Sequence, residues 1–328
     1  MHIVITGGAG FIGKKLAAAL LAANGITLEG QTNKPLERLT LFDVVEAVGL
    51  PDDPRLSTVA GDITDADQVR ALIGEGVDAV FHLAAIVSAN AEADFDLGMA
   101  VNLGGTRHVL EACRRLGSRP RLVFASSVAV YGGDMPTVGY DDMILNPQTS
   151  YGGQKAAGEL LVNDYSRKGF VDGRALRLPT IVVRPGKPNK AASTFASSII
   201  REPLNGEEAI CPVSRESVMY ILSPRRVIEA MLHALSLPSE VFAQARMLTL
   251  PGISVSIDEV EAALAEVAGQ NVADRIRWQP DELIQKIVSG WLPAFDAKRA
   301  REMGFQADES IEAIIRAHIE DELGGTVR

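Results

Sequence analysis

A glycine-rich loop follows the first apolar run of the chain. The strand-like segment 2–6 leads directly into Gly7-Gly-Ala-Gly10-Phe-Ile-Gly13, and an apolar helical stretch begins near residue 11. Glycines at this spacing, between a strand and a helix, allow a tight turn and close backbone approach to a pyrophosphate, which the positive helix N-terminus attracts. The loop therefore predicts a dinucleotide site containing Gly7, Gly10, Phe11, Ile12 and Gly13. A purely structural glycine turn is the alternative.

The same alternation of strand and helix continues to about residue 184. Strands are predicted at Ile3–Thr6, Leu39–Asp43, Ser57–Ala60, Ala79–Ala84, Leu122–Ser126 and Arg174–Val183. Helices are predicted near 11–23, 65–74, 93–116 and 150–168. This pattern indicates an α/β fold, a Rossmann doubly wound parallel sheet with helices on both faces, in which ligands bind at the carboxyl ends of the strands.

The pattern is less regular after Arg184. We predict a nucleotide-binding domain at 1–184 and a smaller mixed α/β substrate-binding part at 185–328, with some late elements packing back on the first domain. Short strands are expected near 217–222 and 246–250, and a helix near 193–201. The isoleucine stripe within 309–323 falls on one helical face, which is typical of core packing.

Composition narrows the choice of partner and compartment. The net charge of -10 argues against a general nucleic-acid binder, because phosphate neutralisation needs a basic surface. The two cysteines, Cys113 and Cys211, do not form a disulfide framework, and we find no leader or membrane-length apolar run. These features predict a cytoplasmic protein that binds neither nucleic acid nor membrane and has no metal site.

Acidic residues at two strand ends indicate which dinucleotide binds. Asp43 ends the second predicted strand, where a carboxylate accepts hydrogen bonds from ribose hydroxyls and repels the 2'-phosphate of NADP, so NAD is the predicted cofactor. A helix cap or solvated turn is the alternative, because an insertion at 24–37 displaces Asp43 from the usual spacing. Asp62 is expected to hold the adenine amino group and Ile63 to pack on the ring. Alternatively, Asp62 or Thr64 caps the next helix.

Tyr151 and Lys155 are four residues apart at the start of a predicted helix, so their side chains share one face. A nearby ammonium stabilises phenolate and makes tyrosine a better base. Ser126 and Ser127 follow the fifth predicted strand, at the cofactor edge of the sheet. We predict that Ser127 orients a substrate oxygen and Tyr151 exchanges its proton, while Ser126 lines the cofactor. The two serine roles remain interchangeable.

These motifs resemble the extended short-chain dehydrogenase/reductase family, also known as the NAD-dependent epimerase/dehydratase family. The resemblance spans nearly the whole chain and rests on the glycine loop, Asp62, His82–Ala85, Asn102–Thr106, Ser127–Tyr131, Tyr151–Lys155 and Lys298–Gly304. It implies that Leu83, Ala84, Asn102 and Pro179 contribute to the cofactor site. It also implies that Tyr151 and Lys155 contact the nicotinamide ribose, and that a homodimer forms through the helices near 93–116 and 150–168.

The substrate side departs from the pattern of nucleotide-sugar members. Arg177–Thr180 replaces a segment that usually carries a sugar-nucleotide asparagine, and Ser217–Ser223 lacks the usual arginine and aspartate. The segment 178–204 instead resembles members that oxidise a small four-carbon sugar acid. The predicted substrate residues are Ser88, Ser127, Tyr151, Thr180, Lys187, Asn189, Ser193 and Arg201. Alternatively, Lys187 is a solvated loop charge and Arg201 pairs with Glu202.

The predicted reaction is NAD-dependent oxidation of the 2-hydroxyl of a small sugar acid to the 2-oxo acid. One alternative is a UDP-sugar 4-epimerase or dehydratase, although Val128 and Ala129 stand where dehydratases commonly carry an acidic pair. The other is a non-catalytic NAD-sensing protein, which would have no need of an activated phenol.

Overall fold

A computed structural model describes residues 1–28, 31–186, 192–242 and 245–327. The chain divides into two compact units, and each is assembled from three segments. The first unit contains Met1–Val130, Thr149–Arg177 and Ile228–Leu248, and the second contains Tyr131–Gln148, Leu178–Val227 and Thr249–Arg328. The division therefore differs from a single boundary at residue 184, because 131–148 joins the second unit and 228–248 returns to the first.

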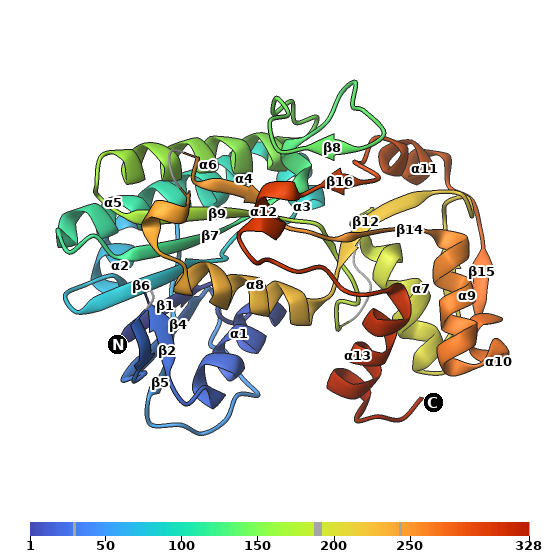
Figure 1. Cartoon of the computed structure of the whole chain (residues 1–328), viewed down its shortest axis with the longest axis horizontal. Helices are drawn as coiled ribbons and strands as arrows, with labels where there is room; N and C mark the ends of the chain where they lie inside the picture. Colours follow the sequence, from blue (N-terminus) through green and yellow to red (C-terminus); the bar gives the residue numbers. More distant parts are fainter. Residues whose placement is uncertain (29–30, 187–191, 243–244, 328) are drawn as a thin grey trace. The chain divides into compact units, whose positions relative to one another are not determined.

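A seven-stranded sheet forms the centre of the first unit, in the order β13-β9-β7-β6-β1-β4-β5 (Figure 1). Its strands are β1 (His2–Thr6), β4 (Arg38–Asp43), β5 (Leu56–Ala60), β6 (Val77–His82), β7 (Arg121–Ser127), β9 (Asp172–Leu178) and β13 (Met247–Thr249). The pairs β4–β5, β1–β4, β1–β6 and β6–β7 are all parallel. The predicted α/β fold class is confirmed.

Two strand predictions need correction. The run Arg174–Val183 is not one strand, because it breaks at Pro179 into β9 and the short β10 (Thr180–Ile181), which pairs with β12 in the second unit. Proline has no N–H to donate to a ladder, and this explains the break. The strand expected near 246–250 is β13, and it extends the large sheet instead of belonging to the substrate-binding part.

Helices cover both faces of this sheet. In Figure 1, α5 (Thr106–Leu116) and α6 (Ser150–Arg167) run above it, whereas α1 (Phe11–Ala22) and α8 (Pro224–Ser236) lie below. Helix α2 (Ala66–Leu72) packs beside α5. The helix expected near 93–116 is instead α3 (Ser88–Ala93), α4 (Phe95–Gly98), a π-helical turn (Met99–Gly105) and α5. Asp94 separates the first two because its side chain caps α4, accepting the N–H of Leu97.

The second unit combines small sheets with helices. Its strands are β8 (Gly139–Tyr140), β10, β11 (Ala209–Cys211), β12 (Val218–Leu222), β14 (Ile253–Ser256), β15 (Ile276–Trp278) and β16 (Phe295–Asp296). Its helices are α7 (Thr194–Leu204), α9 (Ile257–Ala268), α10 (Gln270–Ala273), α11 (Glu282–Ser289), α12 (Lys298–Glu302) and α13 (Ile311–Leu323). Ile311, Ile314 and Ile315 are buried in its core, so the predicted packing role of the isoleucine stripe is confirmed. Among the described helices of both units, none is long and apolar enough to cross a membrane.

Candidate active site

The glycine loop has the close packing and the open backbone that a pyrophosphate requires. Gly7 has a φ of 74°, and a Cβ there would lie 2.7 Å from the amide nitrogen of Ala84. A Cβ on Gly13 would collide with the carbonyl oxygen of Gly7. On Gly10, by contrast, a Cβ would approach only that same oxygen, at 3.2 Å. Helix α1 has no capping side chain and no acidic residue in its first turn, so its N-terminus fits an anion.

Asp43 lies at the end of β4 and braces the glycine loop. Its carboxylate accepts the N–H of Ala9 at 3.0 Å and that of Val44 at 2.8 Å. The insertion forms a separate hairpin of β2 (Ile26–Leu28) and β3 (Gln31–Lys34), so β4 still pairs beside β1. A carboxylate has about four acceptor positions, and those left over suit ribose hydroxyls. The loop-bracing role and the predicted ribose contact are compatible.

The segment after β5 differs in detail from expectation. Asp62 is exposed and its carboxylate accepts the N–H of Thr64 at 2.8 Å, while the buried Ile63 packs against Gly105. The cap of α2 is Asp65, which accepts the N–H groups of Asp67 and Gln68. The alternative that Asp62 or Thr64 caps this helix is therefore wrong. The predicted adenine contacts of Asp62 and Ile63 stay predictions.

His82 is a structural residue at the end of β6. Its Nδ1 lies 2.7 Å from Thr6 Oγ1 and its Nε2 lies 2.9 Å from Thr106 Oγ1. Because Thr106 donates its hydroxyl to the carbonyl of Asn102, Nε2 of His82 carries the proton and Nδ1 accepts from Thr6. Burial, followed by the charge of Lys155, lowers the pKa of His82 to about 3. The ring is neutral and committed to this chain of hydrogen bonds.

Asn102 also makes internal contacts. Its amide accepts the N–H of Ile86 at 2.9 Å and donates to Gln154 Oε1 at 2.7 Å, which ties the turn after β6 to α6. The predicted cofactor residues Leu83 and Ala84 lie half-buried in that turn. Ser88, also half-buried, begins α3. Through its hydrogen bonds to the backbone of Ile86, Asn102 thus supports the turn that carries these predicted cofactor residues.

The first unit brings together Tyr151, Lys155 and the residues at the end of β7. The Lys155 ammonium lies 5.6 Å from the centre of the Tyr151 ring and donates to the carbonyl of Ala125 at 2.8 Å. Burial lowers the pKa of Lys155 to about 8, although the nearby Glu159 opposes that shift. Ser127 is half-buried, and its Oγ accepts the N–H of Ala129 at 3.1 Å. Thr149 caps α6 and fixes the start of the helix that carries Tyr151.

The hydroxyl of Ser126 makes an internal contact, and its predicted place beside the cofactor stays a prediction. Ser126 is 2% exposed, and its hydroxyl donates to Glu159 at 2.5 Å. The same carboxylate binds Arg177 in a two-pronged ion pair. Ser127 is therefore better placed than Ser126 to orient a substrate. Our sequence analysis missed Glu159, although its position four residues after Lys155 on one helical face was a usable signal.

The predicted substrate residues of the second unit form contacts of their own. Arg201 is 8% exposed and donates to Glu202 at 2.6 Å and to the carbonyl of Arg184 at 2.6 Å, so the pairing with Glu202, which was the alternative to a substrate role, is present. Ser193 accepts a hydrogen bond from Arg184. Pro179 is buried, and Thr180 is half-buried in β10. Lys187 and Asn189 lie outside the described residues.

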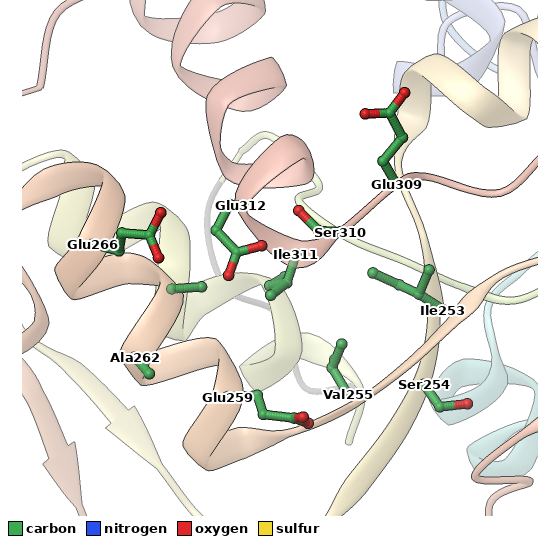
Figure 2. A pocket seen from close by; sticks show the side chains of 11 residues that line it. Ile253, Ser254, Val255, Glu259, Ala262, Glu266, Glu309, Ser310, Ile311 and Glu312 are labelled. Atoms are coloured by element: carbon green, nitrogen blue, oxygen red, sulfur yellow. The ribbon is translucent and has the colours of Figure 1, made fainter.

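An open pocket of about 400 Å³ lies in the second unit (Figure 2). Four glutamates, Glu259, Glu266, Glu309 and Glu312, contribute to its lining. None of the candidate residues that the structure describes lines it. Its acidic character disfavours an anionic substrate such as a sugar acid.

A glycine loop after β1, a carboxylate at the end of β4 and a Tyr–Lys pair on α6 define a dinucleotide-dependent oxidoreductase of the doubly wound class. The chain belongs to the NAD-dependent epimerase/dehydratase family, whose model matches residues 3–245. The resemblance to that family and the prediction of NAD as cofactor are confirmed.

Individual relatives cover nearly the whole chain. It is 54% identical to a D-erythronate dehydrogenase of Cupriavidus necator, over 98% of each chain. It is 44% identical to a D-erythronate dehydrogenase of Haemophilus influenzae, over 98% of this chain and 99% of the relative. A solved structure described as a nucleoside-diphosphate-sugar epimerase from Agrobacterium tumefaciens is 45% identical and superposes with a TM-score of 0.94, covering 100% of this chain and 96% of that one.

Proposed function

We propose that this protein oxidises the 2-hydroxyl of D-erythronate, or of a closely similar sugar acid, to the 2-oxo acid with NAD. Two full-length relatives named D-erythronate dehydrogenase support the substrate. The observation that carries the chemistry is the buried Lys155 ammonium, 5.6 Å from the centre of the Tyr151 ring. This arrangement stabilises a phenolate near neutral pH.

Each residue of the site has a separate task in this reaction. The N–H of Ala129 donates to Ser127 Oγ and holds that oxygen in place. The Ser127 hydroxyl then donates its own proton to the substrate oxygen. The Tyr151 phenolate removes the proton of the substrate's 2-hydroxyl, while Lys155 stabilises the negative charge on the phenol. NAD, when bound on the glycine loop, supplies the acceptor for the hydride that leaves carbon 2. The products are the 2-oxo acid, NADH and a proton held by Tyr151.

The direct test is to supply purified protein with NAD and D-erythronate and follow NADH absorbance. We expect stoichiometric NADH and a 2-oxo acid detectable by derivatisation of the carbonyl. L-Threonate and D-threonate, which differ in stereochemistry, serve as matched substrates. Absence of NADH with every four-carbon sugar acid would refute the proposal.

Nucleotide-sugar epimerisation is the second candidate, because a 45% identical structure carries that description. Against it, the segment Arg177–Thr180 lacks the expected asparagine, and the guanidinium of Arg177 is buried against Glu159. An epimerase returns the hydride to its product, so UDP-glucose would be converted without net NADH. Conversion of UDP-glucose together with inactivity toward D-erythronate would favour this candidate.

For the substrate residues of the second unit, Ser193 offers the simplest test. Its hydroxyl accepts from Arg184 and can donate to a substrate hydroxyl or carboxylate. We propose that Ser193 binds the sugar acid, as we do for Lys187, Asn189, Thr180, Arg201 and Ser88. We expect Ser193→Ala to raise KM for D-erythronate and leave KM for NAD unchanged. The reverse pattern would exclude Ser193 from the substrate site.

We further propose a cytoplasmic homodimer that pairs through α4 and α6. Phe95 is 59% exposed, Leu97 43% and Leu160 61%, and such apolar side chains on neighbouring helices favour association. The buried thiols Cys113 and Cys211 suit a reducing compartment. Sedimentation should give a dimer that Leu160→Glu dissociates. Cell fractionation tests the compartment.

A further inference from the structure

A buried polar cluster lies one helical turn beyond Lys155 on α6. The Glu159 side chain is fully buried, and Arg177 from β9 donates to its two oxygens at 2.9 and 2.7 Å. Ser126, at the end of β7, donates to the same carboxylate at 2.5 Å. Three elements therefore place one negative charge in the protein interior, with donors on both oxygens.

The Glu159 carboxylate lies near Lys155, the lysine of the proposed catalytic pair. Glu159 follows Lys155 by four residues, so both side chains lie on one face of α6. Lys155 itself donates to the carbonyl of Ala125, the residue before Ser126, and lies 4.8 Å from the centre of the Phe124 ring. The lysine is 2% exposed, so solvent screens this charge interaction little.

The charges around Lys155 can be listed by element. The titratable groups on α6 are the Tyr151 phenol and Glu159, and the one on β6 is the neutral His82. On β9 there is Arg177, whose charge is paired with that of Glu159. Burial lowers the pKa of Lys155 to about 8, and Glu159 acts in the opposite direction. Without Glu159, the lysine would lose the negative charge that opposes the effect of burial. It would then lose its proton at a lower pH and could no longer stabilise phenolate.

We propose that Glu159 is a positioning residue for proton transfer: held by Arg177 and Ser126, it keeps Lys155 charged where that lysine faces Tyr151. Arg177 and Ser126 act through Glu159 and contact neither substrate nor cofactor in this scheme. The inference deepens the proposed dehydrogenase function and rests on it, because it assigns the support for the proposed base.

The test compares Glu159→Gln with the double variant Glu159→Gln/Arg177→Met. The single variant keeps the shape of the side chain and removes the negative charge opposite Arg177. The double variant also removes the buried guanidinium, so we expect it to fold even where the single variant does not. Asp164→Asn, an exposed carboxylate change on the same helix, is the matched control.

Two readouts separate positioning from a general structural role. The first is the pH dependence of kcat for NAD reduction with D-erythronate. The second is the NMR titration of Tyr151 in protein labelled with 13C at tyrosine Cζ, where Tyr151→Phe identifies the signal among the five tyrosines. We expect both midpoints to move about one pH unit upward in each Glu159 variant that folds. Asp164→Asn should leave both unchanged.

The outcomes distinguish this inference from the proposed function. A Tyr151 titration in the folded double variant that is unmoved, or moved downward, would overturn the role of Glu159. If the wild type does not oxidise D-erythronate, but the Tyr151 titration still moves upward in the Glu159 variants, the role of Glu159 is supported and the proposed substrate is refuted. If the wild type does not oxidise D-erythronate, the NMR titration of Tyr151 therefore still decides the role of Glu159.

Discussion

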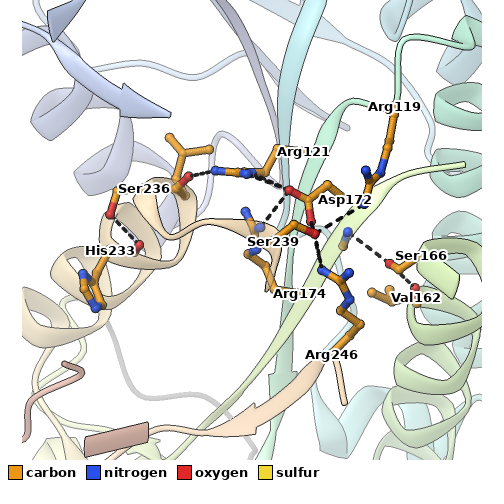
Figure 3. A network of polar contacts seen from close by, with 12 residues as sticks. Arg119, Arg121, Val162, Ser166, Asp172, Arg174, His233, Ser236, Ser239 and Arg246 are labelled. Atoms are coloured by element: carbon orange, nitrogen blue, oxygen red, sulfur yellow. Dashed lines mark hydrogen bonds and ion pairs between the residues drawn. The ribbon is translucent and has the colours of Figure 1, made fainter. Parts of the chain in front are cut away.

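Each end of strand β9 takes part in a buried ionic cluster, and the two clusters differ in how burial and charge shift the pKa values of their groups. At the first end, Asp172 is 2% exposed and receives donors from Arg121, Arg174 and Arg246 (Figure 3). At the other end, Arg177 pairs with Glu159, one helical turn from the proposed catalytic residue Lys155. Desolvation raises the pKa of Asp172, but Arg174 and Arg121 lower it by more, so its net pKa is lowered. At the Glu159 end, the neighbouring Lys155 has a pKa lowered toward neutrality.

This difference leads us to expect that one end of the strand contributes to stability and the other supports the proposed chemistry. The Asp172 cluster links β7, β9, α8 and the chain near β13, and its carboxylate is more stable charged than neutral. The Lys155 neighbourhood holds an ammonium in a place where burial disfavours its charge. A group with a pKa close to the working pH suits catalysis and costs stability. Four substitutions test whether the two ends are separable in this way.

The largest effect should come from Tyr151→Phe at the catalytic end. Loss of the phenolic oxygen removes the proton acceptor, so we expect kcat to fall about 10³-fold. The melting temperature and the Kd for NAD should stay near wild type, because the aromatic ring remains. Steady-state kinetics and calorimetry measure the two properties. Turnover within tenfold of wild type would exclude Tyr151 as the base.

Asp172→Asn should produce the opposite pattern. It leaves three guanidinium groups around a neutral amide, and breaking such a buried network costs about 3 kcal/mol. Urea unfolding measures this loss, and kcat per folded molecule should change less than about twofold, within the range expected for a remote site. The exposed Asp164→Asn is the control and should leave the unfolding midpoint in place. A large fall in kcat for Asp172→Asn would show that the two ends are coupled.

Lys155→Met should lower kcat by less than Tyr151→Phe does and yet stabilise the fold near pH 7. The pKa of Lys155 is about 8 in the folded chain and 10.5 ordinarily, so the unfolded chain binds the proton more tightly. The buried ammonium therefore destabilises the fold fully below pH 8, and that cost disappears as pH rises toward 10.5. We expect a gain on the order of 2 kcal/mol at pH 7 that shrinks at alkaline pH. Unfolding curves at pH 7, 8.5 and 10 test the trend, and a gain that grows with pH would contradict it.

The smallest effect is expected at the cap of α6. Thr149 Oγ1 accepts the N–H of Gly152 at 3.1 Å, and Thr149→Ala should cost about 1 kcal/mol with little change in kcat. Thr149→Gly should cost less, because glycine is tolerated at a helix N-cap. If Thr149→Ala instead lowers kcat tenfold without loss of stability, the cap positions Tyr151 directly.

Local sequence patterns were sufficient for the features that depend on neighbouring residues. Three glycines between a strand and a helix predicted the loop in which Gly7 takes a positive φ. The four-residue spacing of Tyr151 and Lys155 placed both on one helical face, as observed. The sequence was less informative at the two serines, because adjacent residues of a strand end point in opposite directions and only the fold shows which one meets Glu159.

The glycine spacing, the strand–helix alternation and the Tyr–Lys pair were thus determined by the sequence alone, because each depends on backbone geometry over a few residues. Tertiary structure decided that β13 joins the large sheet and that Arg177, 18 residues from Glu159, forms its ion pair there. It also decided that Arg174 and Arg177, three residues apart on one strand, pair with different carboxylates, Asp172 and Glu159 respectively. Pairings between distant segments depend on packing and desolvation, which leave no periodic signal in a single sequence.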